Sequence, residues 1–197
     1  MTAMRHPTAA GRARTSGGRN QVRIIGGEWR SRILRFPDSA SLRPTPDRVR
    51  ETLFNWLGQR LYGLACLDIF AGSGALGFEA LSRGAERVVM VESGSEAARS
   101  LGENACSLGA ADLEIVAGDA LAYLARTAEL FDVVFVDPPY ASDLAARALQ
   151  ALPARLKPGA RVYVEGAAPL EASPAWRVLR EDRAGAVRYA LLELSTP

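Results

Sequence analysis

The chain has 197 residues, of which 48% are hydrophobic, and its formal net charge is only +2. This length and apolar content suit a single α/β domain with its own core. No run approaches the ~20 consecutive apolar residues of a membrane-spanning helix, and the first residues lack the apolar stretch of a secretory signal. The chain has one histidine, His6, and two cysteines, Cys66 and Cys106. We therefore expect a cytoplasmic protein without a disulfide, a metal site or membrane contact, in which both cysteines are small core residues.

The charge is distributed unevenly along the chain. Up to Arg35 there are eight arginines and a single acid, Glu28. Residues 1–21 also lack hydrophobic periodicity, which predicts a disordered basic extension ahead of one domain over 22–197. A basic arm is typical of proteins with a polyanionic partner. Because lysine occurs only once, at Lys157, arginine is the usual cation of this chain, and ordinary surface charge is an alternative explanation.

The first predicted elements form a small N-terminal unit. Residues 22–36 are expected to be a β-hairpin, because two short strand-like runs flank a Gly-Gly turn signal. A helix is expected from Pro46 to about Leu57. Thr45 is its predicted N-cap, since threonine accepts a hydrogen bond from the first helical turn and proline suits the first helical position.

The run LDIFAGSGALG, residues 67–77, is the centre of the sequence. Its apolar start predicts a buried strand ending near Phe70, and the glycines that follow give G-x-G-x-x-G before a helix that ends at Gly84. Strand, glycine turn and helix together favour a ligand site at the helix N-terminus. Three interpretations are open at this point: an empty tight turn, a dinucleotide site, and an S-adenosylmethionine site in which Asp68 serves the cationic amino acid part of the cofactor.

Predicted strands and helices alternate from here onward. They fall at strand 65–70, a helix to 83, strand 87–92, helix 95–108, strand 113–117, a helix to 126, strand 131–137, helix 143–152, a turn at 157–159, strand 161–165, and a closing hairpin of 176–183 with 187–194. This alternation predicts a parallel sheet with helices on both faces over 65–197, and an antiparallel hairpin at its C-terminal end.

Three acids stand at or just beyond the carboxyl ends of successive predicted strands. Asp68 ends the first, Glu92 the second, and Asp119 follows the third. Ligands bind at this edge of an open α/β sheet. A carboxylate at Glu92 could accept both hydroxyls of a ribose, and Asp119 could receive an adenine amino group, although Asp119 could equally be a helix cap. This pattern fits NAD and S-adenosylmethionine alike.

The motif Asp137-Pro138-Pro139-Tyr140 follows the fourth strand of this core and separates those two cofactors. Two prolines make the loop stiff and remove two N–H donors, so its carbonyls act as acceptors. Asp137 and the Pro138 carbonyl could each accept one N–H of a planar exocyclic amine, while Tyr140 stacks on the ring. A methyl transfer to nitrogen uses this arrangement and a nicotinamide enzyme does not, although a structural strand-end turn is the simpler alternative.

Four blocks of this sequence resemble the RsmD family of bacterial 16S ribosomal RNA guanine-N2 methyltransferases. They are VRIIGGE at 22–28, LRPTPDRVRETLFNWLG at 42–58, LDIFAGSGALGFEALSRGA at 67–85 and FDVVFVDPPY at 131–140. The match runs in order from about Val22 to Leu194. Residues 1–21 lie outside it.

The resemblance implies a Rossmann-like, class I methyltransferase fold with S-adenosylmethionine as donor and a guanine of the small ribosomal subunit as acceptor. The residues expected to carry the reaction are Asp137, Pro138 and Tyr140. Those expected to hold the cofactor are Asp68, Phe70, Gly72, Gly74, Glu92, Asp119 and Ala120. Those expected to bind RNA phosphates are Arg23, Arg30, Arg32, Arg43 and Arg48. A compact single domain makes a monomer the expectation.

Three rival functions remain open from the sequence. A DNA adenine-N6 or cytosine-N4 methyltransferase uses the same Asp-Pro-Pro-Tyr motif, but the chain has little room for a target-recognition domain. An NAD-dependent oxidoreductase would share the glycine loop, but it leaves residues 137–140 without a role. A non-catalytic RNA-binding assembly factor with this fold is the third.

Overall fold

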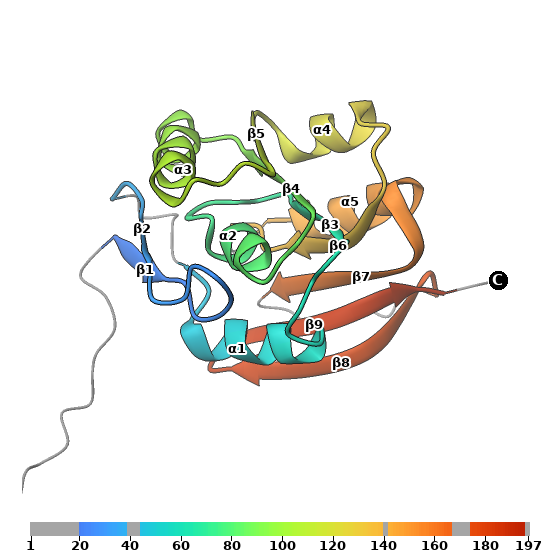
Figure 1. Ribbon diagram of the computed structural model, residues 1–197. Coiled ribbons are helices and arrows are strands. Elements are labelled where there is room, and N and C mark those ends of the chain that lie inside the picture. The colour runs from blue at the N-terminus through green and yellow to red at the C-terminus, as the bar shows by residue number, and fades with distance from the viewer. Residues whose placement is uncertain (1–19, 39–43, 140–141, 167–173, 196–197) are drawn as a thin grey trace, which may run out of the picture.

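A computed structural model describes residues 20–38, 44–139, 142–166 and 174–195 of the chain (Figure 1). Residues 1–19, Arg43 and Tyr140, on which sequence predictions were made, lie outside this described part. Within it, seven strands form a central sheet, two more form a small hairpin, and five α-helices pack around them. No helix among the described residues is both long and apolar enough to cross a membrane.

The elements follow one another in alternating order after the N-terminal hairpin. They are β1 (Gln21–Arg23), β2 (Ile33–Arg35), α1 (Asp47–Trp56), β3 (Ala65–Asp68), α2 (Ala75–Ser82), β4 (Arg87–Glu92), α3 (Ser95–Leu108), β5 (Leu113–Ala117), α4 (Ala120–Arg126), β6 (Phe131–Val136), α5 (Leu144–Ala151), a short 3-10 turn (Leu152–Arg155), β7 (Leu156–Gly166), β8 (Trp176–Ala184) and β9 (Val187–Leu194).

The large sheet has the strand order β5-β4-β3-β6-β7-β9-β8. Its first five strands are parallel, β9 pairs antiparallel with β7, and β8 pairs antiparallel with β9. The predicted Rossmann-like sheet with a closing antiparallel hairpin is therefore confirmed. The chain moves outward from β3 through β4 to β5 and then returns to the other side of β3 as β6. The carboxyl ends of β3 and β6 thus form the switch point where ligands bind in open α/β sheets.

Both faces of the sheet are covered, as the near-continuous apolar runs of its parallel strands require. Residues alternate along each strand. Val88 and Met90 of β4 pack with the hairpin, α1, α2 and Leu101 of α3 on one face. Val89 and Val91 pack with α4 and α5 on the other (Figure 1). At the carboxyl ends of the parallel strands, the connecting loops rather than the helices border the sheet.

The N-terminal hairpin is fastened to the C-terminal end of α2. The backbone N–H of Glu28 donates to the Ser82 carbonyl at 2.7 Å, and that of Trp29 donates to the Ser82 hydroxyl at 2.9 Å. Gly27 has a φ of +75°, and a Cβ there would lie 1.7 Å from the Ser82 carbonyl oxygen. The predicted Gly-Gly turn is thus also the point at which the hairpin loop touches the core, and only glycine fits it.

Two sequence predictions, one about the cysteines and one about the turn at 157–159, were wrong in detail. Cys66 is buried in β3, where burial raises the pKa of its thiol to about 12, but Cys106 is exposed on α3 and is not a core residue. The predicted turn at 157–159 is part of β7. The pairing with β6 jumps from Phe131–Leu156 to Val133–Arg161, so the extra residues form a bulge rather than ending the strand.

Candidate active site

A cavity of about 270 Å³ lies at the switch point of the sheet. Its wall consists of the segments that follow β3, β4, β5 and β6, which are residues 68–73, 91–94, 118–120 and 137–139, together with parts of α2 and α5 and with Pro44 and Thr45 from the segment before α1. Six of the seven residues predicted to hold the cofactor line it, as do Asp137 and Pro138 of the predicted reaction site. The strand-end acids are thus brought into one cavity.

Asp68 is the most deeply buried carboxyl group in this wall, with 1% of its surface exposed. Its Oδ2 accepts a hydrogen bond from the Gly77 amide at 3.0 Å, whereas its Oδ1 has no hydrogen-bond partner within the described structure. Burial, opposed by the Gly77 hydrogen bond and reinforced by the charge of Glu92, raises the pKa of Asp68 to about 7. A buried carboxyl oxygen without a partner is costly, and a cationic ligand group would satisfy it.

Glu92 ties the glycine loop to the next strand. Its Oε2 accepts the Gly72 amide at 2.8 Å and its Oε1 accepts the Gly94 amide at 2.6 Å. These bonds fix the carboxylate in the cavity wall at the end of β4. Since each carboxylate oxygen can accept more than one hydrogen bond, Glu92 retains the capacity to accept the hydroxyls of a ribose.

Asp119 performs the capping role that the sequence left open. Its Oδ1 accepts the Ala122 amide at 2.8 Å as the N-cap of α4, and both Asp119 and Ala120 also line the cavity. Gly74, in contrast, does not line the cavity. It has a φ of +77°, and a Cβ there would lie 2.6 Å from Leu101 and 2.7 Å from Phe78, so its requirement is for a tight turn and close packing at the start of α2.

Asp137 stands immediately beyond β6, next to the end of β3. Burial first, then the charge of Glu165, raises the pKa of Asp137 to about 8; a hydrogen bond from Thr45 opposes this shift, and Asp68 adds to it. Pro138 is buried beside it and Pro139 is exposed. The predicted stacking residue Tyr140 is outside the described residues, so the acceptor side of the site rests on Asp137 and Pro138.

Thr45 is the site residue that sequence reasoning missed. It was predicted to cap α1, but the N-cap position is held by Pro46 and no side-chain hydrogen bond caps the helix. The Thr45 hydroxyl donates instead to Asp137 Oδ2 at 2.9 Å, 92 residues along the chain. A threonine before proline and aspartate has the local pattern of a cap, so nothing in the neighbouring sequence signals this long-range contact.

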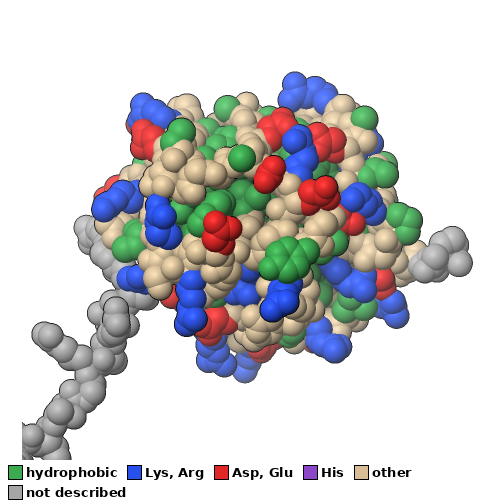
Figure 2. All heavy atoms as spheres, viewed as in Figure 1, with side chains coloured by type: hydrophobic (Ala, Val, Ile, Leu, Met, Phe, Trp, Pro, Cys, Tyr) green, Lys and Arg blue, Asp and Glu red, His purple; other side chains and the backbone are tan. Residues whose placement is uncertain are grey.

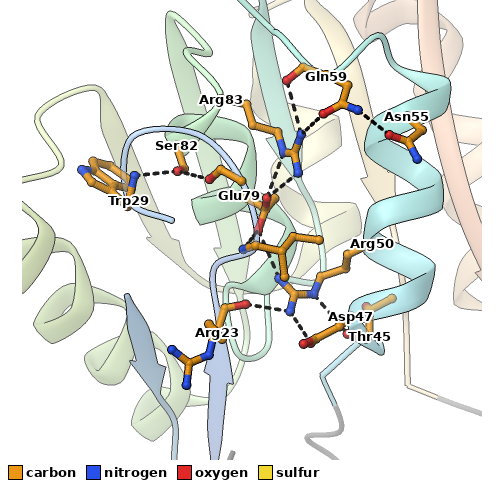
Figure 3. Close-up of polar contacts among 12 residues, drawn as sticks. Arg23, Trp29, Thr45, Asp47, Arg50, Asn55, Gln59, Glu79, Ser82 and Arg83 are labelled. Carbon is orange, nitrogen blue, oxygen red and sulfur yellow. Dashed lines mark hydrogen bonds and ion pairs between the residues drawn. The ribbon is translucent and has the colours of Figure 1, made fainter. Parts of the chain in front are cut away.

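The basic residues fall into three groups. Arg50 is fully buried and pairs with Glu79 of α2 at 3.2 Å and with Asp47 at 2.7 Å (Figure 3). Arg30 and Arg32 are exposed, but they belong to the hairpin loop that is fastened to the far end of α2. Arg23 is on β1 and Arg48 is in the first turn of α1.

A second cavity, of about 250 Å³, adjoins the first. It is lined by Arg23 and other residues of the hairpin strands and by residues 44–47, so the two cavities share Pro44 and Thr45. Thr45 therefore forms part of the partition between the strand-end cavity and a groove beside the N-terminal hairpin.

The carboxyl groups of the main cavity suit a ligand that carries an organic cation and a ribose. Two carboxyl groups with raised pKa values, the buried Asp68 and the partly buried Asp137, are both favoured in their ionised form by a nearby positive charge. Among the described residues, no group of three or more His, Cys, Asp or Glu side chains is arranged to hold a metal ion. Glu92 and Asp119 supply acceptors farther along the same edge.

Comparison with known proteins agrees with this geometry. The family model described as "Conserved hypothetical protein 95" matches residues 22–193. Ribosomal RNA small subunit methyltransferase D of Escherichia coli K12 is 44% identical over 181 residues, which cover 89% of this chain and 91% of the relative. The protein of the same name from Haemophilus influenzae is 42% identical, with 91% and 97% covered.

The solved structures show the same similarity in three dimensions. A putative methyltransferase from Escherichia coli superposes with a TM-score of 0.82 at 41% identity and covers 90% of this chain and 99% of its own. A putative methylase from Haemophilus influenzae gives a TM-score of 0.75 at 41% identity, with 87% and 97% covered. Fold and sequence therefore point to the same group of proteins.

Proposed function

Because the chain belongs to the family of ribosomal RNA small subunit methyltransferase D, we propose that it transfers a methyl group from S-adenosylmethionine to N2 of a guanine in 16S ribosomal RNA of the small subunit. The observation that carries this proposal is the placement of Asp137 and Pro138 beside Asp68 in one cavity at the switch point. An acceptor for a planar amine and an acceptor for a cationic donor are thereby adjacent.

The hydrogen-bond acceptors of the cavity support the choice of methyl donor. S-adenosylmethionine supplies a methyl group activated on a sulfonium. Asp68 Oδ1, which has no partner within the described structure, would accept from the ammonium of its amino acid part. Glu92 would accept the ribose hydroxyls, while Asp119 and the Ala120 amide would meet the adenine. The glycine loop keeps its backbone against the ligand through the Gly72–Glu92 bond.

On the acceptor side, Asp137 and the Pro138 carbonyl would each accept one N–H of the guanine amine. These two bonds orient the nitrogen lone pair toward the methyl group, so the transfer depends on alignment. The N–CH₃ bond forms as the S–CH₃ bond breaks, and the amine then releases one proton. Asp137, whose pKa is raised to about 8, stands where that proton leaves.

The RNA would reach this site from the side of the second cavity. A base must leave its stack to enter the pocket, which costs a few kcal/mol for a paired base and less in a loop. Arg23 lines that cavity and Arg48 follows Asp47, which also lines it. Contacts from these arginines to phosphates would place the strand without reading its sequence. The hairpin and the start of α1 thus support a polyanionic acceptor.

Transfer of a labelled methyl group to small ribosomal subunits, naked 16S RNA and duplex DNA, measured in parallel, tests the proposal. We expect labelled N2-methylguanine from small subunits or their RNA. Asp137→Ala should lower that transfer by at least about a hundredfold, with S-adenosylmethionine affinity retained in calorimetry. Label in DNA adenine or cytosine would support the DNA methyltransferase alternative. No transfer to any substrate would favour a non-catalytic assembly factor.

A further inference from the structure

Thr45 makes a hydrogen bond to Asp137 that its position in the sequence does not predict. The residue is 4% exposed, lines both cavities, and gives its hydroxyl hydrogen to Asp137 Oδ2 at 2.9 Å. Helix α1 consequently begins without a side-chain cap, although threonine is among the residues that serve best in that role. The Thr45 hydroxyl therefore does not cap α1 but donates its hydrogen bond to Asp137, which is distant in the sequence.

Arg50 holds the Thr45 backbone in place. Its Nε donates to the Thr45 carbonyl at 3.3 Å, and one of its terminal nitrogens donates to the Arg23 carbonyl of β1 at 2.8 Å. The same guanidinium is anchored by Glu79 of α2, which also accepts the Ile25 amide at 2.8 Å (Figure 3). Thr45 is therefore fixed by a fully buried group that also holds the hairpin strand, so its hydroxyl reaches Asp137 from a rigid position.

We propose that Thr45 is a positioning residue for methyl transfer: its hydroxyl orients the Asp137 carboxylate toward the acceptor amine and stabilises that carboxylate in its ionised form. This inference rests on the proposed function, since it gives Asp137 the role of amine acceptor. A hydrogen bond from a hydroxyl favours the ionised carboxylate and fixes its rotation about the Cβ–Cγ bond, leaving the remaining acceptor capacity of the group for the substrate.

The surroundings of Asp137 make this donor important. Within the described structure, the charged groups that act on it are two acids, Glu165 from β7 and Asp68 from β3. Both disfavour ionisation of Asp137, whereas Thr45 favours it. Because the ionised carboxylate accepts an amine N–H more strongly than the protonated carboxyl group does, turnover should rise with pH along the limb where Asp137 loses its proton.

The test compares Thr45→Val, which keeps the shape and removes the donor, with Thr45→Ser, which keeps the donor. Steady-state kcat and KM are measured on small ribosomal subunits at saturating S-adenosylmethionine from pH 5.5 to 9, together with melting temperature and calorimetric cofactor affinity. We expect Thr45→Val to lower kcat about tenfold and to move the acid limb of the profile upward by about one pH unit. Thr45→Ser should behave as the native chain, with KM for the subunits unchanged in both.

The outcomes separate the two proposals. If the native chain methylates guanine N2 and Thr45→Val keeps its kcat and its acid limb, the role of Thr45 is refuted while the function stands. The same holds if Thr45→Ser loses as much activity as Thr45→Val, because the methyl packing would then be what matters. If the native chain transfers no methyl group, both proposals fail. Thr45→Ala, which also removes the donor, takes the place of Thr45→Val should valine lower the melting temperature.

Discussion

Two carboxyl groups, the buried Asp68 and the partly buried Asp137, determine the electrostatics of the cavity. Desolvation is the largest cause of the raised pKa of each, about 7 for Asp68 and about 8 for Asp137. The charge of Glu92 adds to the shift of Asp68, and the charges of Glu165 and Asp68 add to that of Asp137. For an acid, a pKa above its unfolded value means that folding favours the protonated form. Stability of the ligand-free protein should therefore fall as pH rises from about 4 to 8, and a bound cation should offset that loss.

The pH dependence of cofactor binding follows from Asp68. Between pH 5.5 and 7 its carboxyl becomes increasingly ionised, so S-adenosylmethionine should bind about tenfold more tightly at pH 7. Asp68→Asn keeps an oxygen for the Gly77 amide but carries no charge. It should bind more weakly, and the share of the pH dependence that belongs to Asp68 should disappear. Calorimetric titrations at both pH values measure this, and equal affinities of the native chain at pH 5.5 and 7 would contradict the assignment.

The residues of the site differ in how far the sequence could reveal them. Asp68, Glu92 and Asp119 could be predicted because the carboxyl ends of parallel strands share one edge, and the position of each acid relative to its strand is a local property. Thr45 could not, because its partner is 92 residues away. Gly74 was assigned to the ligand since a glycine motif does not distinguish a close ligand from the close packing of Leu101 and Phe78.

Among the elements, α1 shows the same limit of local patterns. Of the apolar residues at helical spacing in α1, Val49 and Leu53 are buried and Trp56 is only partly buried. The structure buries Arg50 in addition, because Glu79 of α2 lies opposite it. Helical periodicity identifies a buried face by its apolar residues. The burial of a cation such as Arg50 therefore cannot be predicted until its partner on another helix is known.

The Glu79 carboxylate joins three elements, and its charge is the basis of a stability prediction. It pairs with Arg50 of α1 at 3.2 Å and with Arg83 at the end of α2 at 2.8 Å, and it accepts the Ile25 amide behind β1. Removing one charge from a buried pair leaves the partner charge uncompensated. We therefore expect Glu79→Gln to lower the free energy of unfolding by about 3 kcal/mol in chemical denaturation.

An exposed ion pair on the central sheet serves as the matched control for the buried Glu79 pairs. Arg87 and Glu114 form an ion pair at which both side chains are nearly half exposed, and such pairs contribute less than about 1 kcal/mol. Glu114→Gln should therefore leave the unfolding midpoint almost unchanged. Equal losses for Glu79→Gln and Glu114→Gln would show that burial of the Glu79 network does not matter to stability.

The molecule as a whole is nearly neutral, but its surface is not uniform. Figure 2 shows Lys and Arg side chains gathered along the lower edge of the view, the side of α1 and of the β8–β9 pair. The described exposed arginines of these elements are Arg48, Arg177, Arg180, Arg183 and Arg188. The hairpin of β8 and β9 was not among the predicted RNA-binding segments, because its arginines alternate with acids in the sequence and only the fold brings them to the same side as α1.

The approach through the second cavity predicts which arginines bind RNA. Arg23 lines this groove and Arg48 directly follows Asp47, which also lines it. The double variant Arg23→Ala/Arg48→Ala removes both cations. Its affinity for small ribosomal subunits should fall, and the slope of log affinity against log salt should become shallower by about 1.5, since each phosphate contact contributes roughly 0.7 to 0.9. Filter binding across a salt series measures both quantities.

The control for this prediction removes two cations from the opposite edge of the sheet. Arg60 lies just before β3, and Arg126 lies at the end of α4, which runs away from the cavity. Both are exposed, so Arg60→Ala/Arg126→Ala changes the net charge by the same amount without touching the groove. Because a contact to phosphate requires proximity whereas a general attraction depends on net charge, equal losses in the two double variants would mean that RNA is attracted by the charge of the whole molecule. A loss confined to Arg23→Ala/Arg48→Ala would place the RNA beside the N-terminal hairpin.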